Sequence, residues 1–369
     1  MKPKSIAANV SLIIASIVVA MLIGEAALRV YQKAVYGIPF LSGLHDIQGS
    51  AMSPIELDDV LGWRATPNFL EGGYAENLDG STFPVHVTSD ANGFRVFGNV
   101  GSARPKILVI GDSFTQATDV SDGKTYYSLL GEALDAEIFA YGAGGYGTLQ
   151  EYMILDRYFA EIVPDIVILQ YCPNDFINNS LELEIDSKTS NNGMIRPYWI
   201  DGRIQYFMPK KHPVLRMFAL KYSRIIYLIL TRLDMIKAGF VTQAVGPGDE
   251  ESFDPKAEQR ARDTTQELLK MIHARLGGTS IIAFSSAKRA AADAQFRELS
   301  KKEGITYIDG VGLSVQAQQE RGDVVRIKDG HWNEAGHRIV ADRLVDYIRN
   351  SGLPAHKNNH GAIQHRVTK

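Results

Sequence analysis

Residues 106–115 read KILVIGDSFT, and this stretch determines the fold class that the sequence predicts. Lys106–Ile110 is an apolar run without polar alternation, which is typical of a strand buried on both faces of a parallel sheet. The Gly-Asp-Ser that follows predicts a turn, which presents the hydroxyl of Ser113 at the carboxyl end of the strand. Active sites of open parallel sheets lie at that edge. The tripeptide is a weak signal alone, because an ordinary helix N-cap uses the same residues.

Further apolar runs repeat this pattern along the chain. Strands are predicted at 137–141, 165–171, 280–285 and 305–309. Helix-like stretches lie at 123–135, 148–161, 256–276, 288–303 and 335–350. Because buried strands alternate with helices, the pattern predicts a three-layer α/β/α domain with a parallel sheet, which we place at residues 104–350.

The segments outside this pattern differ in composition. Residues 29–103 combine a stalk with a stretch at 57–98 rich in turn residues and β-formers, which predicts a small β-rich segment. An insertion at about 177–255 is longer than an ordinary connection. It contains an apolar helix candidate at 213–240 with five basic residues and one acid. Such a helix can lie on a membrane, cover a pocket as a lid, or pack on the sheet with its basic side chains in water.

Residues 351–369 are predicted to be a flexible tail. They contain three histidines, His356, His360 and His365. Metal binding is one reading of these side chains, but a solvated chain end is favoured.

The N-terminus predicts a membrane anchor. Residues 6–24 carry no charge, and a helix of that length spans about 28 Å, close to the ~30 Å hydrocarbon core. Two lysines precede the run, as in a cleaved signal peptide, but the run is long and the residues after it form a poor cleavage site. We therefore expect a transmembrane helix at 6–28 with a short cytoplasmic tail at 1–5. The remaining chain is expected outside the cytoplasm, in the periplasm if the source is a Gram-negative bacterium.

The composition limits the class of protein. Hydrophobic residues make up 45% and charged residues 22% of the 369 residues, which are globular values. The net charge of −3 provides no basic field, so no nucleic-acid partner is expected. The single cysteine, Cys172, makes neither an intramolecular disulfide nor a zinc cage, and we expect it to be a small buried apolar residue. The oligomeric state does not follow from the sequence.

Further residues with chemical potential follow the predicted strands. The glycine-rich segment at 142–147 lets backbone N–H groups approach a ligand closely, as an oxyanion hole requires. Asn174 can donate to the same oxyanion, and His331 can serve as a general base. Taken singly, each also has a purely structural reading as turn chemistry. His337 falls inside a predicted helix and is expected to be structural.

Serine, glycine, asparagine and histidine thus follow predicted strands in this order. Together they resemble the four sequence blocks of the SGNH (GDSL-type) hydrolase superfamily, over about residues 104–350. The resemblance implies a flavodoxin-like SGNH fold and a serine esterase without metal or organic cofactor. It also implies Ser113 as nucleophile, His331 as base and Asp329 as the acid that orients the imidazole. The oxyanion hole that it implies consists of the N–H groups of Ser113 and Gly145 and the side chain of Asn174.

Three departures from the superfamily pattern stand out. Ala140 replaces the usual Asn of the second block, and Cys172 replaces the usual Gly of the third; neither is a proposed catalytic group. The final block is Asp329-x-His331-Trp332 rather than Asp-x-x-His. This spacing resembles that of SGNH-like proteins that act on cell-envelope polysaccharides, including alginate O-acetyltransferases. Lys328 stands where the usual acid would be, so Asp309 and Asp323 are the fallback acids.

The resemblance implies hydrolysis of an acyl ester, with an O-acetyl group on an envelope glycan or a lipid as the expected substrate. One alternative is an O-acyltransferase, because the same triad can pass the acyl group to a glycan hydroxyl instead of water. Another is a catalytically silent protein that binds glycan in the same cleft.

Overall fold

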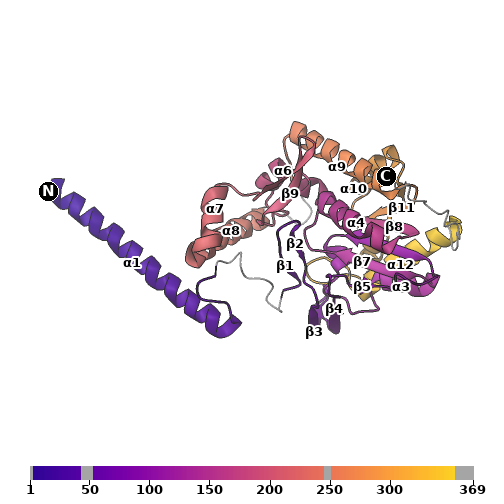
Figure 1. The fold of residues 1–369 in the computed structure, drawn as a ribbon, viewed down its shortest axis with the longest axis horizontal. Coiled ribbons are helices and arrows are strands. Elements are labelled where there is room, and N and C mark those ends of the chain that lie inside the picture. The colour runs from indigo at the N-terminus through magenta and orange to yellow at the C-terminus, as the bar shows by residue number, and fades with distance from the viewer. Residues whose placement is uncertain (1–2, 43–52, 245–250, 354–369) are drawn as a thin grey trace, which may run out of the picture. The chain divides into compact units, whose positions relative to one another are not determined.

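The computed structural model describes residues 3–42, 53–244 and 251–353. The chain, drawn as a ribbon in Figure 1, divides into two compact units. Unit 1 comes from Met1–Thr66 and Phe176–Thr265, and unit 2 from Pro67–Asp175 and Gln266–Lys369. The predicted tail lies outside the described residues from residue 354 onward, together with its three histidines.

Unit 2 is built on a six-stranded sheet. In spatial order its strands are β12 (Thr306–Tyr307), β11 (Ser280–Ser285), β8 (Ile166–Tyr171), β6 (Lys106–Gly111), β7 (Glu137–Gly142) and β5 (Val96–Phe97). The first five are mutually parallel, as predicted. The sheet is nevertheless mixed, because β5 pairs antiparallel with β7. Because β5 is only two residues long, it has no hydrophobic periodicity from which the sequence could predict a strand.

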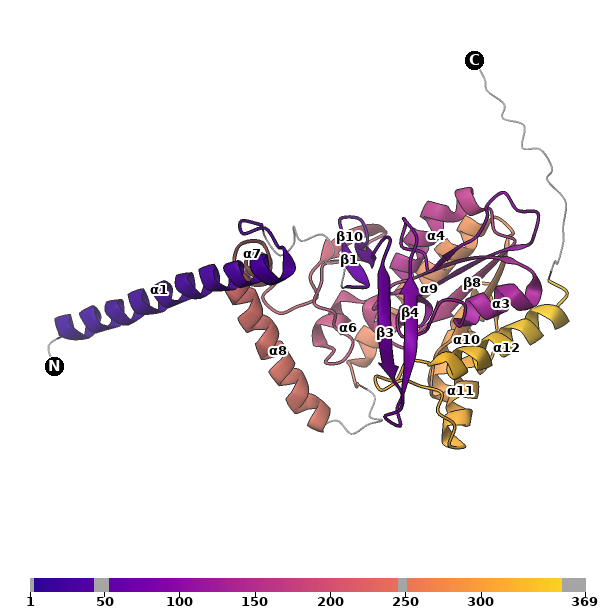
Figure 2. The same ribbon diagram turned by 90° about the horizontal axis from the view of Figure 1, so that it is seen from below.

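Helices cover both faces of the sheet, which confirms the predicted α/β/α layers (Figures 1 and 2). On one face α3 (Tyr126–Leu134) packs beside α12 (Glu334–Asn350), and α11 (Val311–Glu320) packs against α12. The strand order reverses direction at β6, so right-handed crossovers put the next helices on the other face. There α4 (Thr148–Ile162) contacts β6 and β7, and α10 (Ala290–Lys302) contacts β11 and β12. The sequence did not predict α11.

The main core of unit 2 lies between the sheet and the layer of α3, α11 and α12. Strand residues such as Val109 and Ile168 are fully buried there, which explains the absence of polar alternation in these strands. The helix residues of the same cluster include Tyr126, Leu130, Val315, Val340, Leu344 and Ile348.

The predicted β-rich segment forms two hairpins before β5. The hairpin of β1 (Ile55–Asp58) and β2 (Gly62–Ala65) belongs to unit 1, and that of β3 (Leu70–Glu76) and β4 (Thr82–Thr88) to unit 2. Unit 1 also holds α6 (Leu181–Asp186) and a hairpin of β9 (Arg196–Ile200) and β10 (Arg203–Phe207). The buried guanidinium of Arg196 joins these elements, because it pairs with Glu184 of α6 at 2.7 Å and lies over the ring of Trp63 in β2. Three other helices are α2 (Ser113–Gln116), α5 (Asp175–Asn178) and α9 (Pro255–Leu276). The boundaries between the two units fall within α5 and α9.

The helices of unit 1 differ from the prediction in one respect. The single helix expected at 213–240 is divided into α7 (Pro213–Tyr222) and α8 (Arg224–Ala244). Ser223 leaves the helical conformation, with φ −137° and ψ 103°. The helix α1 (Pro3–Tyr36) contains a stretch, Asn9–Val35, that is long and apolar enough to cross a membrane, as either an anchor or a signal sequence would be.

Candidate active site

Ser113 is the first residue of α2, and Asp112 alone separates it from the end of the central strand β6. The carboxylate of Asp112 caps this short helix by accepting the Phe114 N–H at 3.0 Å. The strand-to-helix turn thereby fixes the serine at the carboxyl end of the sheet, as the sequence predicted.

The structure brings Ser113, His331 and Asp329 into one hydrogen-bonded chain. His331 Nε2 lies 2.7 Å from Ser113 Oγ. His331 Nδ1 lies 2.9 Å from a carboxylate oxygen of Asp329, which also accepts the His331 backbone N–H at 3.0 Å. This geometry suits a neutral imidazole that donates from Nδ1 to the carboxylate and accepts the serine proton at Nε2.

The loop that carries Asp329 and His331 is held by further hydrogen bonds. Ile327 N–H donates to His331 O at 3.0 Å, and Gly330 N–H donates to Ile327 O at 2.9 Å. The buried guanidinium of Arg326 donates to Gly330 O at 2.8 Å. Gly330 has φ 96°, a conformation that favours glycine. This tight turn folds the carboxylate of Asp329 back onto the ring of His331, although only one residue separates the two.

Neighbouring groups shift the pKa values of Asp329 and His331 in opposite directions. Burial alone would raise the pKa of Asp329, but the hydrogen bonds that it accepts from His331 lower it overall. Burial opposes a charged imidazole, yet the bond to Asp329 and the nearby carboxylates of Asp112 and Asp119 raise the pKa of His331 above its usual value. His331 is thus stabilised in the protonated form that it takes after accepting a proton.

Two buried carboxyl groups lie close to each other in unit 2. Burial raises the pKa of Asp112, and burial together with Asp175 and Asp112 raises the pKa of Glu151 well above its usual range. Both groups therefore hold a proton more readily than an exposed carboxyl group does.

The glycine-rich segment after β7 lies beside the serine. Gly144 N–H donates to the side-chain oxygen of Gln116 at 2.8 Å, so α2 holds this segment in place. A Cβ on Gly144 would lie 3.9 Å from the Cβ of Ser113. Gly145, the predicted oxyanion donor, has φ 76°, which again favours glycine.

Asn174 follows β8, the neighbour of β6 on its other side. The turn that carries it is closed by Cys172 N–H, which donates to Asp175 at 3.0 Å. Since β6, β7 and β8 are parallel neighbours, Ser113, Gly145 and Asn174 come from the carboxyl ends of adjacent strands.

Three residues that the sequence analysis did not assign to the main site lie in buried or ion-paired surroundings, namely His337, Cys172 and Asp309. His337 is buried in α12, where its Nδ1 accepts the Tyr126 N–H at 3.0 Å and burial lowers its pKa to about 3. Cys172 is buried, and burial raises the pKa of its thiol well above the usual value. The fallback acid Asp309 pairs with Arg297 at 3.4 Å, while it is Asp329 that contacts His331.

Two residues near the site were missed in the sequence, namely Gln116 and Asp119. Gln116 lies one helical turn after the serine, a spacing that would have marked it as a neighbour of the same site. Asp119 lies in the loop after α2 and has no local signal that connects it with the histidine.

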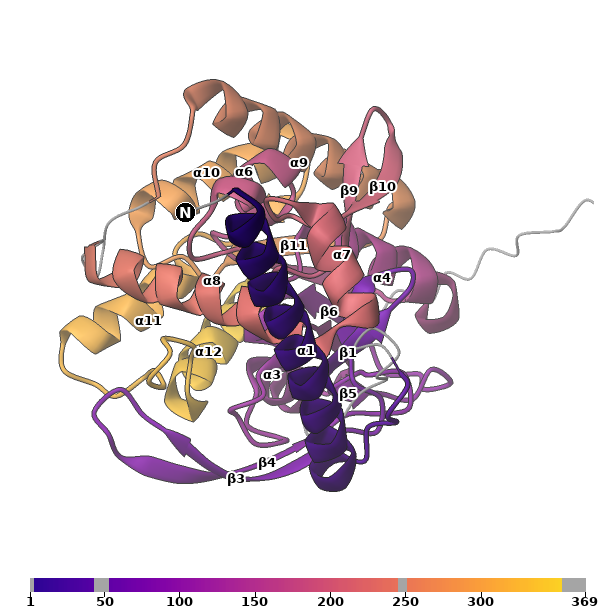
Figure 3. The same cartoon turned by 90° about the vertical axis from the view of Figure 1, so that its left-hand side faces the viewer.

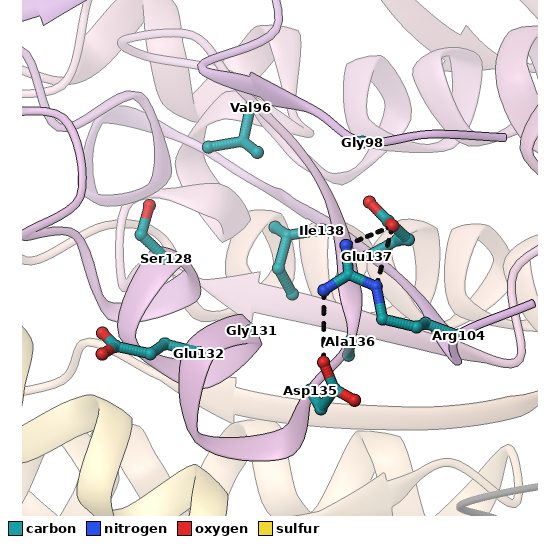
Figure 4. A pocket seen from close by; sticks show the side chains of 10 residues that line it. All are labelled: Val96, Gly98, Arg104, Ser128, Gly131, Glu132, Asp135, Ala136, Glu137 and Ile138. Carbon is teal, nitrogen blue, oxygen red and sulfur yellow. Dashed lines mark hydrogen bonds and ion pairs between the residues drawn. The ribbon is translucent and has the colours of Figure 1, made fainter. Parts of the chain in front are cut away.

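A separate pocket of unit 2 lies at the other edge of the sheet (Figure 4). Its lining includes Ala136 and Glu137, at the amino end of β7, whereas the triad follows the carboxyl ends of strands. Arg104 also lines it and forms ion pairs with Glu137 and Asp135. This pocket shares no residue with the triad.

The sequence model described as "GDSL-like Lipase/Acylhydrolase family" matches residues 109–339, more than half of the chain. No curated protein matches the chain significantly. Similar solved structures include Est2A, an acetyl xylan esterase from Butyrivibrio proteoclasticus, with 14% identity, 73% of this chain and 68% of that chain covered, and a TM-score of 0.38. Another is the lipase/acylhydrolase from Enterococcus faecalis, with 12% identity, 67% and 96% covered, and a TM-score of 0.38.

Proposed function

The chain belongs to the GDSL-like lipase/acylhydrolase family and acts on ester bonds, and from this premise we propose that it is a serine esterase that uses Ser113, His331 and Asp329. The observation that carries the proposal is the chain of hydrogen bonds from Ser113 Oγ through His331 to Asp329, at 2.7 and 2.9 Å. A silent binding protein has no need of this alignment.

The proposed reaction follows from these contacts. His331 Nε2 accepts the proton of Ser113 as Oγ attacks the acyl carbonyl, and the Asp329 carboxylate stabilises the imidazolium that results. The N–H groups of Ser113 and Gly145 and the Asn174 amide stabilise the oxyanion. His331 then returns its proton to the leaving alcohol, and water, activated by the same histidine, releases the acid from the acyl-enzyme.

The proposed substrate is an O-acetyl ester on a cell-envelope glycan. The support is the final block, Asp329-x-His331-Trp332, whose spacing resembles that of SGNH-like proteins acting on envelope polysaccharides. We also assign α1 as an uncleaved anchor that holds the remainder of the chain outside the cytoplasm. The uncharged run before Glu25, in a helix whose apolar side chains are exposed, supports this assignment.

Intact-mass analysis of the full chain after fluorophosphonate treatment tests the nucleophile. We expect one covalent adduct in the wild type, no adduct in Ser113→Ala and slow labelling in His331→Ala. Ser351→Ala, which removes an exposed hydroxyl of unit 2, is the matched control and should label like the wild type. Ser113→Ala should also lower kcat/KM for a small acetyl ester by about 10⁴-fold or more.

The outcomes separate the alternatives. An unlabelled but folded wild type would contradict the esterase and favour the binding protein. A mature N-terminus near residue 28 in the same spectra would contradict the uncleaved anchor. Adding an acceptor oligosaccharide to the acetyl donor distinguishes hydrolysis from transfer, because transfer adds an acetyl group to the glycan, whereas hydrolysis releases acetate alone.

A further inference from the structure

The break between α7 and α8 lies against the end of the uncharged run of α1. Glu25 is the first charged residue after that run, and its carboxylate accepts hydrogen bonds from Ser223 Oγ at 3.1 Å, Arg224 N–H at 3.1 Å and Ile225 N–H at 2.8 Å. A carboxylate on the first N–H groups of a helix is a strong cap. Glu25 therefore fixes the start of α8 at the level where α1 would leave the hydrocarbon core.

Two arginines reinforce this junction. The guanidinium of Arg224 is almost fully buried and donates to the side chain of Gln32 at 2.9 Å and to the carbonyl oxygens of Pro39 and Ser42 at 2.7 and 2.9 Å. From α1, Arg29 donates to Tyr222 O at 3.0 Å. These bonds tie the α7–α8 hairpin to the end of the membrane-spanning candidate.

The direction of α8 matters because of this attachment. Figures 2 and 3 both show α8 running away from α1 at a steep angle to it. The two helices are in contact, and a Cβ on Gly24 would lie 2.6 Å from a methyl carbon of Ile225. If α1 spans the bilayer, α8 runs along the surface of the bilayer, as an interfacial helix does.

Both helices of the hairpin expose apolar side chains. On α7 Val214, Phe218 and Tyr222 follow a spacing of four residues and therefore share one face. On α8 the exposed apolar side chains are Leu228, Ile229, Leu233 and Ile236. The polar contact between the helices lies elsewhere on α8, where Asp234 accepts two hydrogen bonds from Arg216 at 2.8 and 2.9 Å. The exposed apolar side chains of α7 and α8 are therefore available to contact another surface.

The charge of this segment selects an anionic surface. Residues 210–237 contain seven lysines and arginines and one acid, and the segment keeps an excess of positive charge even with Arg224 buried and Arg216 paired with Asp234. A basic segment with exposed apolar residues is attracted to anionic lipid headgroups and gains further from burying its apolar face.

We propose that the α7–α8 hairpin is a second membrane contact, which lies in the headgroup region of an anionic leaflet next to the point where α1 enters it. The inference rests on the proposed anchoring by α1. Because α1 alone would keep the protein on the membrane, a binding assay would not reveal the hairpin, and the depth of individual side chains must be measured.

The experiment places a nitroxide on single introduced cysteines in the full chain, reconstituted in nanodiscs of phosphatidylcholine with or without phosphatidylglycerol. Native Cys172 is buried, and labelled wild type serves as the background control. Ile229→Cys and Ile236→Cys report on α8, and Ile17→Cys reports on α1. Lys302→Cys, on an exposed position of α10 in unit 2, is the water control.

Collision rates with oxygen, which concentrates in lipid, and with a water-soluble nickel complex are then compared. We expect the labels at Ile229 and Ile236 to favour oxygen, as the label at Ile17 does, and more strongly with phosphatidylglycerol. The label at Lys302 should favour nickel.

Other outcomes overturn the proposal in distinguishable ways. Nickel-accessible labels at Ile229 and Ile236, with Ile17 in lipid, would refute the second contact and leave the anchor intact. Shielding of those labels from both reagents would mean that a protein surface covers the hairpin. Equal immersion in both lipids would refute the electrostatic part. A nickel-accessible Ile17 would refute the anchor itself.

Discussion

The two units differ in how far their apolar side chains are buried. In unit 2, Ile168 has an exposed fraction of 0%, because strands and helices of the same unit cover it. In unit 1, Ile229 of α8 is 43% exposed and Ile17 of α1 is 58% exposed. The main core cluster of unit 2 therefore consists of residues of that unit alone, whereas α1 and α8 of unit 1 leave a large apolar surface exposed. Chemistry and membrane residence are expected to be separable properties of the two units.

The strongest test of this separation is Asp329→Asn in unit 2. The amide cannot stabilise the imidazolium or hold the same tautomer, so kcat should fall by about 10⁴-fold. Steady-state hydrolysis of a small acetyl ester measures this loss. Sedimentation with membranes after alkaline extraction should be unchanged, and a variant that left the membrane would break the comparison.

A second test compares the same substitution at the two isoleucines. Ile168→Ala creates a cavity in the core of unit 2 and should lower the free energy of unfolding by about 2–5 kcal/mol. Ile229→Ala removes an exposed side chain and should change it by no more than about 0.5 kcal/mol in detergent. Denaturant unfolding followed by tryptophan fluorescence gives both values. Equal destabilisation would show that α8 has a protein partner in solution.

The smallest effect is expected for Asp119→Asn, which removes one negative charge near His331. The nearby carboxylates raise the pKa of His331, and the proposed mechanism requires the neutral imidazole, so activity should be lost as the pH falls through that pKa. Losing the charge of Asp119 lowers this pKa, and the acid limb of the kcat/KM profile should move to lower pH. Asp122→Asn is the matched control, and an acid limb that moves equally in both variants would contradict a specific effect of Asp119.

Much of unit 2 could be predicted because its signals are local. Apolar runs predict the buried strands, and the residues after them predict Ser113 and His331. The resemblance to a known family adds Asp329, and the structure joins the three residues by hydrogen bonds. The edge strand β5 escaped because two residues carry no period, and α11 escaped for lack of a clear apolar face.

The break at Ser223 could not be predicted from the sequence because its cause is not local. Residues 213–240 read as one apolar helix, and no proline or glycine near Ser223 interrupts them. The break is stabilised by Glu25, which lies 198 positions earlier in the chain. An interaction over that distance leaves no mark on local periodicity. Asp119 was missed for the same reason, since its importance depends on a histidine that folding brings near.

The ends of the central sheet have a consequence for solubility during folding. Its outermost strands, β5 and β12, each contain two residues. An edge this short offers few unpaired backbone N–H and C=O groups to a strand of another molecule. Newly made chains that gather at high density would otherwise be prone to add strand to strand and aggregate. The short edge strands of this sheet therefore provide little surface for a strand of another molecule to pair with.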